Sequence, residues 1–159
     1  MTGFGYDIHR FTDTGTGFML GGVWIPAQVS VIAHSDGDVA IHALCDALLG
    51  AAGLGDIGEH FPDSDLQFRN AASAIFLQKT MEILAKDALR PINIDISIVL
   101  EQPKISPYKE EMRRILANLC RLDIRRVSIK ATTNERVGCI GRSEAVAAFA
   151  VCQIEYIEN

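Results

Sequence analysis

Two histidines and an aspartate near the start of the chain are residue types that hold a catalytic metal ion. Asp7 and His9 stand two positions apart in a segment of alternating polarity, so in a strand both side chains leave the same face. His42 lies in a helical pattern, one turn after Asp38 and one turn before Asp46. One carboxylate and two imidazoles suit Zn²⁺ with a fourth position left open. That open position can polarise a phosphoryl oxygen.

The same residues have a plainer interpretation, in which His9 is a solvated strand end and His42 a hydrogen-bonded helix histidine. Three of the four histidines fall within the first 42 residues, beside acidic groups, which favours the metal. Asp38 and Asp46 could then hold the second nitrogen of His42. On spacing alone, both interpretations stay open.

Apolar periodicity in the first third of the chain predicts the elements that must position these groups. Residues 2–9 alternate as a strand, and residues 18–26 form a hairpin that turns at Gly21-Gly22. A helix follows from 39 to about 52, with Ser35 as its cap in a Ser-x-x-Asp pattern. The Asp-Ile-Gly segment after it has the composition of a glycine-rich surface loop.

The rest of the chain alternates between helices and strands. We expect a helix over 69–87, a strand over 92–100, a helix from Ser106 to about 122, and strands over 127–131 and 144–157. The last strand is apolar on both faces, so it should be buried on both sides, by helices on one and by another subunit on the other. The predicted fold class is α/β (α+β): one two-layer domain over residues 1–159, with a mixed, ferredoxin-like sheet and helices on one face.

Composition and charge argue against several classes of protein. With 15 basic and 20 acidic residues the net charge is −5, without a block of like charges, which disfavours nucleic-acid binding. No apolar stretch approaches the ~20 residues that cross a bilayer, and no leader pattern opens the chain. Cys45, Cys120 and Cys152 fit core positions rather than a disulfide framework, so we expect a cytoplasmic protein.

Longer motifs resemble those of the 2-C-methyl-D-erythritol 2,4-cyclodiphosphate synthase family, in the expected order from residue 5 to residue 144. They are Gly5-Tyr-Asp-Ile-His-Arg10, Ala33-His-Ser-Asp-Gly-Asp-Val-Ala-Ile-His42, Gly55-Asp-Ile-Gly58 with Phe61-Pro-Asp63, Gln102-Pro-Lys104, Lys130-Ala-Thr-Thr133 with Glu135, and Gly141-Arg142. The resemblance implies a homotrimer of the non-mevalonate isoprenoid pathway with active sites between subunits. Its substrate would be 4-diphosphocytidyl-2-C-methyl-D-erythritol 2-phosphate, and its products the 2,4-cyclodiphosphate and CMP.

The resemblance also implies roles for individual residues. Asp7, His9 and His42 would hold one Zn²⁺ per chain, and Glu135 a second divalent ion, Mg²⁺ or Mn²⁺. His34 and Thr133 would stabilise the transition state.

The implied substrate-binding residues form three groups along the chain. Beside the metal they are Asp7, Ile8, His9, His34 and Ser35. Around the methylerythritol they are Asp56, Ile57, Gly58, Phe61, Pro62, Asp63, Ser64 and Asp65. Around the cytidine they are Leu100, Glu101, Gln102, Pro103, Lys104, Ile105, Ser106, Thr132, Thr133, Asn134 and Glu135, with Cys139 and Arg142 beyond. Family members often carry an aromatic residue where Cys139 stands, whereas Arg142 suits a phosphate contact or a cavity on the three-fold axis.

Two other functions remain as alternatives. A metal-dependent phosphohydrolase would use the same zinc to activate water and would release a linear product. A non-catalytic trimeric module that binds isoprenoid diphosphates would need neither Glu135 nor the Asp7, His9 and His42 set, whose presence counts against it.

Overall fold

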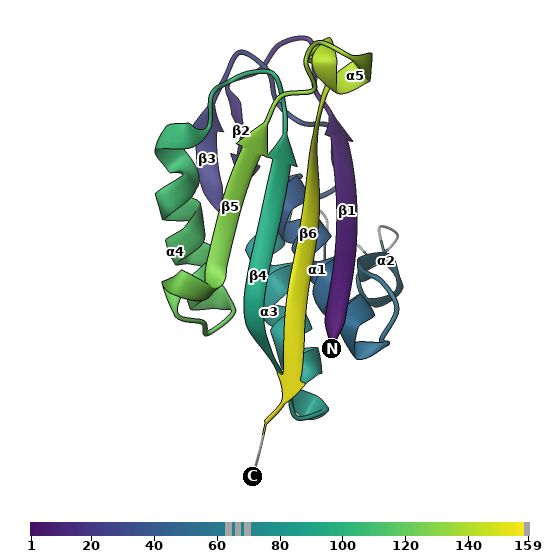
Figure 1. The fold of residues 1–159 in the computed structure, drawn as a ribbon. Helices are drawn as coiled ribbons and strands as arrows, with labels where there is room; N and C mark the ends of the chain where they lie inside the picture. The colour runs from purple at the N-terminus through teal and green to yellow at the C-terminus, as the bar shows by residue number, and fades with distance from the viewer. Residues whose placement is uncertain (63–64, 66–67, 69–70, 158–159) are drawn as a thin grey trace.

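Four strands form a mixed sheet in the computed structural model, which describes residues 1–62, 65, 68 and 71–157 (Figure 1). In order across the sheet they are β1 (Thr2–Arg10), β6 (Ala145–Tyr156), β4 (Leu89–Val99) and β5 (Val127–Thr132). β6 pairs antiparallel with both of its neighbours, whereas β4 and β5 run parallel. The mixed sheet predicted from the sequence is confirmed.

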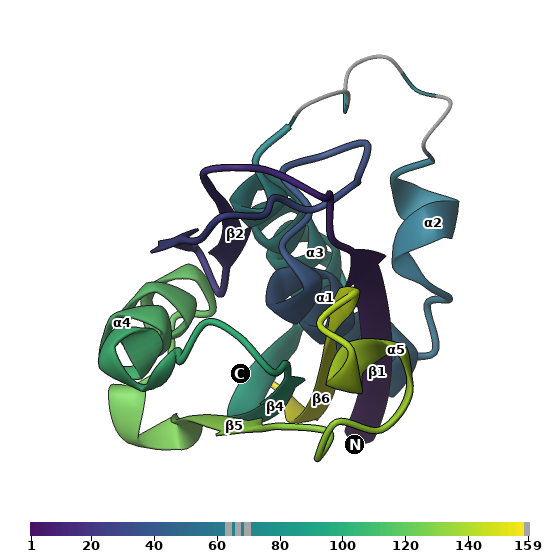
Figure 2. The same cartoon turned by 90° about the horizontal axis from the view of Figure 1, so that it is seen from above.

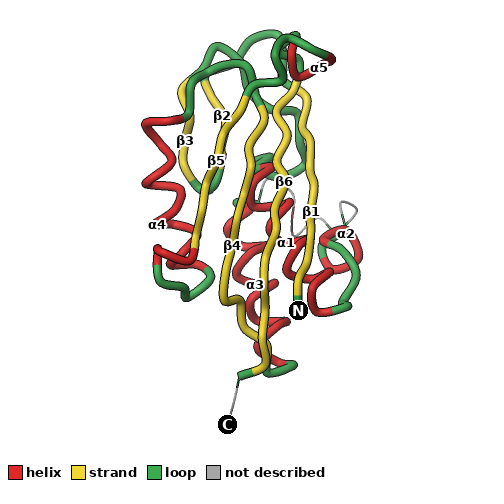
Figure 3. The backbone as a smooth tube through the Cα atoms, in the orientation of Figure 1, coloured by secondary structure: helices red, strands yellow, loops and turns green. Residues whose placement is uncertain are grey.

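Helices cover one face of this sheet and leave the other bare (Figure 2). The long ones are α1 (Val39–Ala52), α3 (Ser73–Lys86) and α4 (Lys109–Leu119). The shorter elements are the hairpin strands β2 (Gly17–Leu20) and β3 (Val23–Pro26), the helices α2 (Ile57–His60) and α5 (Gly138–Gly141), and the 3-10 turns η2 (Ser106–Tyr108) and η3 (Ile124–Arg126). Figure 3 shows α5 at one end of the sheet. Within the described part of the chain, no helix is both long enough and apolar enough to cross a bilayer.

The predicted ferredoxin-like connection is not the one observed. A β-α-β-β-α-β chain joins its second and third strands directly. Here α4 stands between β4 and β5, and the direct step is the one from β5 through the α5 loop to β6. Because α4 carries the chain back to the end of the sheet where β4 began, β5 runs parallel to β4.

Helix starts differ from the prediction in three places, one of which is the helix expected from Ser106: it opens with a 3-10 turn at Ser106–Tyr108, and its α-helical part starts at Lys109. Asp38, not Ser35, caps α1, because its side chain accepts the backbone N–H groups of Ala40 and Ile41. The helix expected from 69 begins at Ser73. The predicted core cysteines Cys45, Cys120 and Cys152 are buried free thiols, as expected, whereas Cys139 is exposed.

The contact between α1 and β1 is closer than any side chain would allow. A Cβ atom added to Gly3 would lie 1.9 Å from the carbonyl oxygen of Ala47, and one added to Gly5 would lie 2.0 Å from that of Ala43. The glycine-bearing face of β1 therefore packs against the helix. Since side chains alternate along a strand, Asp7 also points toward α1.

The opposite face of the sheet carries a strip of apolar side chains that no helix covers. We call Phe4, Tyr6, Ile8, Phe149 and Val151 the apolar strip; they are 38% to 63% exposed. The ring of Phe149 lies 4.9 Å from that of Tyr6, which is opposite it in the β1–β6 pairing. Within a single chain only one face of β6 is fully buried. The chain itself therefore does not bury the second face, which the sequence analysis predicted to be covered by another subunit.

We predict that Gly5→Ala destabilises the fold, because its Cβ would meet the backbone of α1 rather than a flexible side chain. The free energy of unfolding should fall by about 3 kcal/mol, the upper range for overpacking a core. Gly50→Ala is the matched control: it lies exposed on α1 with nothing within 4 Å of the added atom. There alanine should stabilise the helix by up to ~1 kcal/mol. Urea unfolding at equal protein concentration measures both, and equal midpoints would contradict the close contact.

Candidate functional site

Asp7, His9 and His42 meet where the end of β1 passes the first turn of α1. The Asp7 Oδ2 atom lies 3.1 Å from His9 Nε2 and 3.1 Å from His42 Nδ1, and the two ring nitrogens are 3.3 Å apart. All three side chains are partly buried, between 14% and 24% exposed. The structure thus brings together the three ligands that the sequence predicted, one atom from each.

The geometry of this cluster fits a divalent metal ion. Three ligands at about 2.1 Å from a tetrahedral Zn²⁺ lie roughly 3.4 Å from one another. The observed separations of 3.1, 3.1 and 3.3 Å are slightly shorter than this. The three side chains would therefore need to move apart only slightly to bind an ion. The donor set of one oxygen and two nitrogens also leaves a position open for a substrate oxygen.

The ionisation of the cluster already reflects its mutual contacts. Burial acts to raise the pKa of Asp7, but hydrogen bonds from His42 and His9 outweigh it and hold that pKa well below the ordinary value. For His42, burial acts to lower the pKa, and the Asp7 carboxylate reverses this, so the pKa is raised above 6.5. A bound metal ion would take the place of the proton that His42 Nδ1 and Asp7 Oδ2 now share.

The second nitrogen of His42 does not meet the acidic residues predicted for it. His42 Nε2 lies 2.9 Å from Ser73 Oγ and 3.3 Å from Ser35 Oγ. The predicted partners are engaged elsewhere: Asp38 accepts backbone N–H groups, and Asp46 accepts the N–H of Ile57 at 2.8 Å. Sequence reasoning missed Ser73, which is 31 residues away and has no local signal.

A cavity of about 790 Å³ opens beside the cluster. Its polar lining is His9, His34, Ser35 and His42, and its apolar lining is Ile32, Ala33, Ile57, Gly58, Phe61, Pro62, Phe68 and Phe76. The metal group and much of the predicted methylerythritol group therefore share one cavity. Phe68 and Phe76 were not predicted as site residues; the ring of Phe76 stacks on that of Phe61, with the ring centres 5.3 Å apart.

Several members of these two groups stand apart from the cavity. Ile8 belongs to the apolar strip on the other face of the sheet. Asp56 caps α2 by accepting the N–H of Glu59 at 3.0 Å. Asp65 is held by a backbone bond to Pro62, and Asp63 and Ser64 lie outside the described residues.

The predicted cytidine residues form a second group, built from the loops after β4 and β5. Glu101 accepts the backbone N–H of Asn134 at 2.8 Å and of Arg136 at 3.3 Å, so its carboxylate joins the two loops. Thr133 donates its hydroxyl to Glu135 Oε1 at 3.2 Å. The remaining members comprise Leu100 and Ile105, which are buried, and Gln102, Pro103, Lys104, Ser106 and Thr132, which are exposed or partly so.

The last two predicted residues lie beyond this group. Cys139 is exposed at α5, and Arg142 forms an ion pair with Glu144 at 2.7 Å. Among the described residues, none from Leu100 onward lines the cavity beside the metal cluster. Within one chain, the metal cluster and the predicted cytidine residues therefore form two separate groups.

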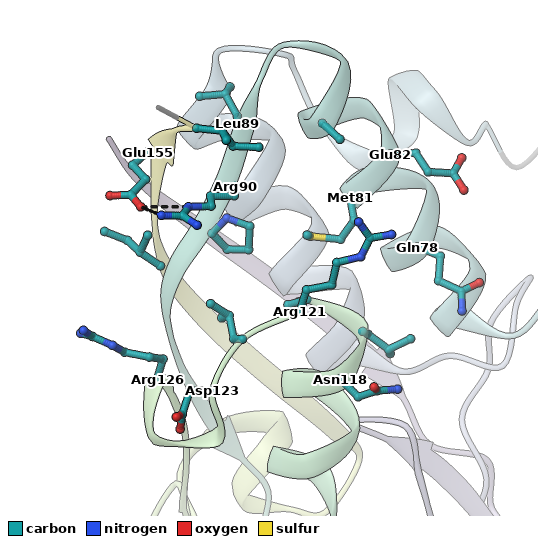
Figure 4. Close-up of a pocket in the computed structure, with 17 residues that line it drawn as sticks. Gln78, Met81, Glu82, Leu89, Arg90, Asn118, Arg121, Asp123, Arg126 and Glu155 are labelled. Atoms are coloured by element: carbon teal, nitrogen blue, oxygen red, sulfur yellow. Dashed lines mark hydrogen bonds and ion pairs between the residues drawn. The ribbon is translucent and has the colours of Figure 1, made fainter. Parts of the chain in front are cut away.

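A somewhat larger cavity, about 860 Å³, lies at the far end of the sheet between α3, α4 and the start of β4 (Figure 4). Arg90 and Glu155 pair at its edge, at 2.7 Å, and Arg121 points toward it from the end of α4. None of Asp7, His9 and His42 is among its described lining residues, so this cavity is separate from the metal cluster.

We predict that His42→Ala abolishes tight Zn²⁺ binding, because it removes one of three ligands. His60→Gln is the control, since His60 contacts the carbonyl of Leu54 at 2.8 Å and offers no atom to the cluster. Equilibrium dialysis of metal-free protein should give about one Zn²⁺ per chain for the control and far less for His42→Ala. Equal retention in both variants would mean that the metal lies elsewhere.

Metal affinity should also depend on pH. His42 must lose its Nδ1 proton to bind a metal, and its raised pKa means that protons compete above pH 6.5. The apparent affinity should therefore fall as pH drops through that raised pKa. Calorimetric titration with Zn²⁺ between about pH 8 and about pH 6 measures the fall, and a constant affinity over this range would contradict it.

Comparison with known proteins agrees with this arrangement. Residues 1–155 match the model of the YgbB family. The 2-C-methyl-D-erythritol 2,4-cyclodiphosphate synthase of Symbiobacterium thermophilum is 51% identical over 97% of this chain and 98% of its own length.

Solved structures give the same result. A 2C-methyl-D-erythritol-2,4-cyclodiphosphate synthase in its CDP-bound form is 36% identical, with a TM-score of 0.89 over 98% of this chain and 100% of its own. The bifunctional IspDF of Campylobacter jejuni is 41% identical, with a TM-score of 0.93 over 99% of this chain. The chain spans only 42% of that longer protein. Full-length similarity to its relatives, together with the match over residues 1–155, shows that the chain belongs to the YgbB family.

Proposed function

We propose that this chain is a metal-dependent 2-C-methyl-D-erythritol 2,4-cyclodiphosphate synthase. It converts 4-diphosphocytidyl-2-C-methyl-D-erythritol 2-phosphate to the 2,4-cyclodiphosphate and releases CMP. The observation that carries the proposal is the Asp7, His9 and His42 cluster beside a cavity of about 790 Å³, in a chain about half identical to such synthases over nearly its full length.

The reaction needs no nucleophile from the protein. The 2-phosphate oxygen of the substrate forms a bond to the β-phosphorus, and the bond from that phosphorus to the bridging oxygen of CMP breaks. The protein must bring two mutually repelling phosphates together and stabilise the charge that develops between them. When bound, Zn²⁺ on the cluster and Mg²⁺ or Mn²⁺ at Glu135 would supply the positive charge for this.

The residues of the cavity have two tasks in this reaction. His34 and Ser35 line it beside the cluster, where N–H and O–H donors can bind phosphate oxygens as negative charge builds. Phe61, Phe68 and Phe76 pack against one another on the apolar side, with ring centres 5.3 to 5.6 Å apart. With substrate bound, this apolar wall offers water no hydrogen-bond partner on that side, which would favour attack by the tethered phosphate over hydrolysis. The wall thus supports a synthase over a phosphohydrolase.

The loops after β4 and β5 are the proposed nucleotide half-site. Glu101 holds the second loop by two backbone N–H groups, which leaves the Thr133 and Glu135 side chains exposed beside one another. In this position Glu135 would hold the second cation and Thr133 would donate to phosphate. The CDP-bound relative is consistent with a cytidine nucleotide as the ligand of this fold.

We further propose that three copies of the chain assemble, so that the metal half-site of one faces the nucleotide half-site of its neighbour. Two observations support this: no described nucleotide-site residue lines the cavity beside the metal cluster, and the apolar strip is left uncovered. An exposed apolar strip on a bare sheet face is a feature of subunit contacts. The buried thiols of Cys45, Cys120 and Cys152 suit a reducing compartment, and we place the enzyme in the cytoplasm.

The product distinguishes the proposed synthase from its alternatives. We expect phosphorus NMR of a turnover mixture to show a cyclic diphosphate together with CMP, and the reaction to stop when a chelator removes the metal. A linear phosphate product would instead identify a phosphohydrolase. Tight substrate or isoprenoid diphosphate binding without turnover would indicate a binding module.

A mixing experiment tests whether the site is shared. His42→Ala lacks a metal ligand and Glu135→Gln lacks the proposed second cation ligand, so each variant alone should be nearly inactive. When the two are unfolded and refolded together, a Glu135→Gln chain can contribute an intact metal half-site to the intact nucleotide half-site of a His42→Ala chain. Part of the activity should return. If native mass spectrometry shows mixed assemblies without activity, each site lies within one chain.

A further inference from the structure

A partly buried chain of hydrogen bonds leads from His42 to a carboxylate that the proposed reaction does not use. His42 Nε2 lies 2.9 Å from Ser73 Oγ, and the Ser73 hydroxyl donates to Asp36 Oδ1. The backbone N–H of Ser73 donates to the other oxygen, Asp36 Oδ2, at 3.0 Å. Ser73 is 0% exposed and opens α3, whereas Asp36 lies in the loop before α1.

The order of these groups fixes where each proton lies. A carboxylate only accepts hydrogen bonds, so the single hydroxyl proton of Ser73 is committed to Asp36. The Ser73 oxygen can then only accept from His42, which places a proton on Nε2. The remaining nitrogen, Nδ1, is left to present its lone pair to a metal ion beside Asp7 and His9.

We propose that Asp36 and Ser73 are positioning residues of the metal centre. They hold His42 with Nε2 protonated and turn its Nδ1 toward Asp7 Oδ2. The inference rests on the proposed function only in taking Asp7, His9 and His42 as the metal ligands. It assigns a role to two residues outside all three substrate-binding groups.

A plainer role for the same contacts is a clamp between the loop before α1 and the start of α3. The two roles differ in which bond matters. The clamp needs the Ser73 backbone N–H on Asp36, and Ser73→Ala keeps that bond. The positioning role needs the hydroxyl, which Ser73→Ala removes.

Zinc affinity of the metal-free protein, measured by competition with a chromogenic chelator, separates the two roles. Loss of an outer hydrogen-bond partner typically weakens metal binding about 10- to 100-fold. We expect a loss in this range for Ser73→Ala. Thr80→Val is the control, because it deletes another fully buried hydroxyl on α3 that lies outside the cluster. Its affinity should equal that of the unsubstituted protein.

Asp36→Asn tests the proton order without a change of volume. Two backbone N–H groups compete for the amide oxygen, because Asp36 accepts the Ser73 N–H on Oδ2 at 3.0 Å and the Asp38 N–H on Oδ1 at 3.3 Å. The shorter bond favours the amide oxygen at the Ser73 N–H, which turns the amide NH₂ group toward Ser73 Oγ. The Ser73 hydroxyl is then free to donate to His42 Nε2, which favours the wrong tautomer. We expect Zn²⁺ affinity to fall in this variant too, and the slowly exchanging Nε2–H signal of His42 in ¹⁵N NMR of the zinc-loaded protein to weaken or vanish.

The outcomes distinguish this inference from the proposed function. If Ser73→Ala and Asp36→Asn both bind Zn²⁺ as tightly as the unsubstituted protein and keep the Nε2–H signal, the positioning role is overturned while the metal site stands. If Ser73→Ala does not fold, Asp36→Asn decides alone. If the unsubstituted protein binds no Zn²⁺, the metal site itself, and with it the proposed function, fails.

Discussion

The contact between β1 and α1 is the constraint on which the metal cluster depends. A strand and a helix that carry ordinary side chains are held apart by them, and imidazole and carboxylate groups are too short to span a wide gap. Gly3 and Gly5 on the strand let the helix backbone approach to where a Cβ would overlap it. This brings Asp7 within 3.1 Å of His42. The two glycines thus determine the geometry of the cluster, because they allow the close approach of α1 to β1.

Asp38 fixes the start of α1 within this contact. It is fully buried, and its carboxylate accepts four backbone N–H groups, two from the helix start and two from Gly21 and Gly22 in the hairpin turn. Burial raises the pKa of this carboxyl, and the bonds from the hairpin and helix amides oppose that effect. A buried charge without such partners would be strongly destabilising. Through Asp38, the hairpin turn therefore fixes the position of the N-terminus of α1, and with it the position of His42.

Local periodicity was enough to predict the strands and the shared face of Asp7 and His9, because alternation is a property of neighbouring residues. It was not enough to tell which face of β1 packs against the helices. An apolar face usually points inward, but here the glycine face does, since only it allows the close contact. Ser73 was out of reach for a related reason: it meets His42 only because α3 packs on α1, and no spacing in the sequence encodes that. The assignment of the loops after β4 and β5 to cytidine came from the resemblance rather than from local periodicity, and it stays a prediction.

The metal cluster and the apolar strip take their residues from opposite faces of the same strand, β1. Along β1, Asp7 and His9 point toward α1, and Phe4, Tyr6 and Ile8 point away from it. A shift of one residue in the pairing of β1 with β6 would exchange these faces, since the side-chain period is two. It would carry the metal ligands to the bare face and force aromatic rings against the backbone of α1, where even a methyl group does not fit. The surface proposed for assembly and the metal site are therefore not independent features. Whatever fixes the register of β1 for one fixes it for the other, and an active cluster implies an apolar strip in place on the opposite face.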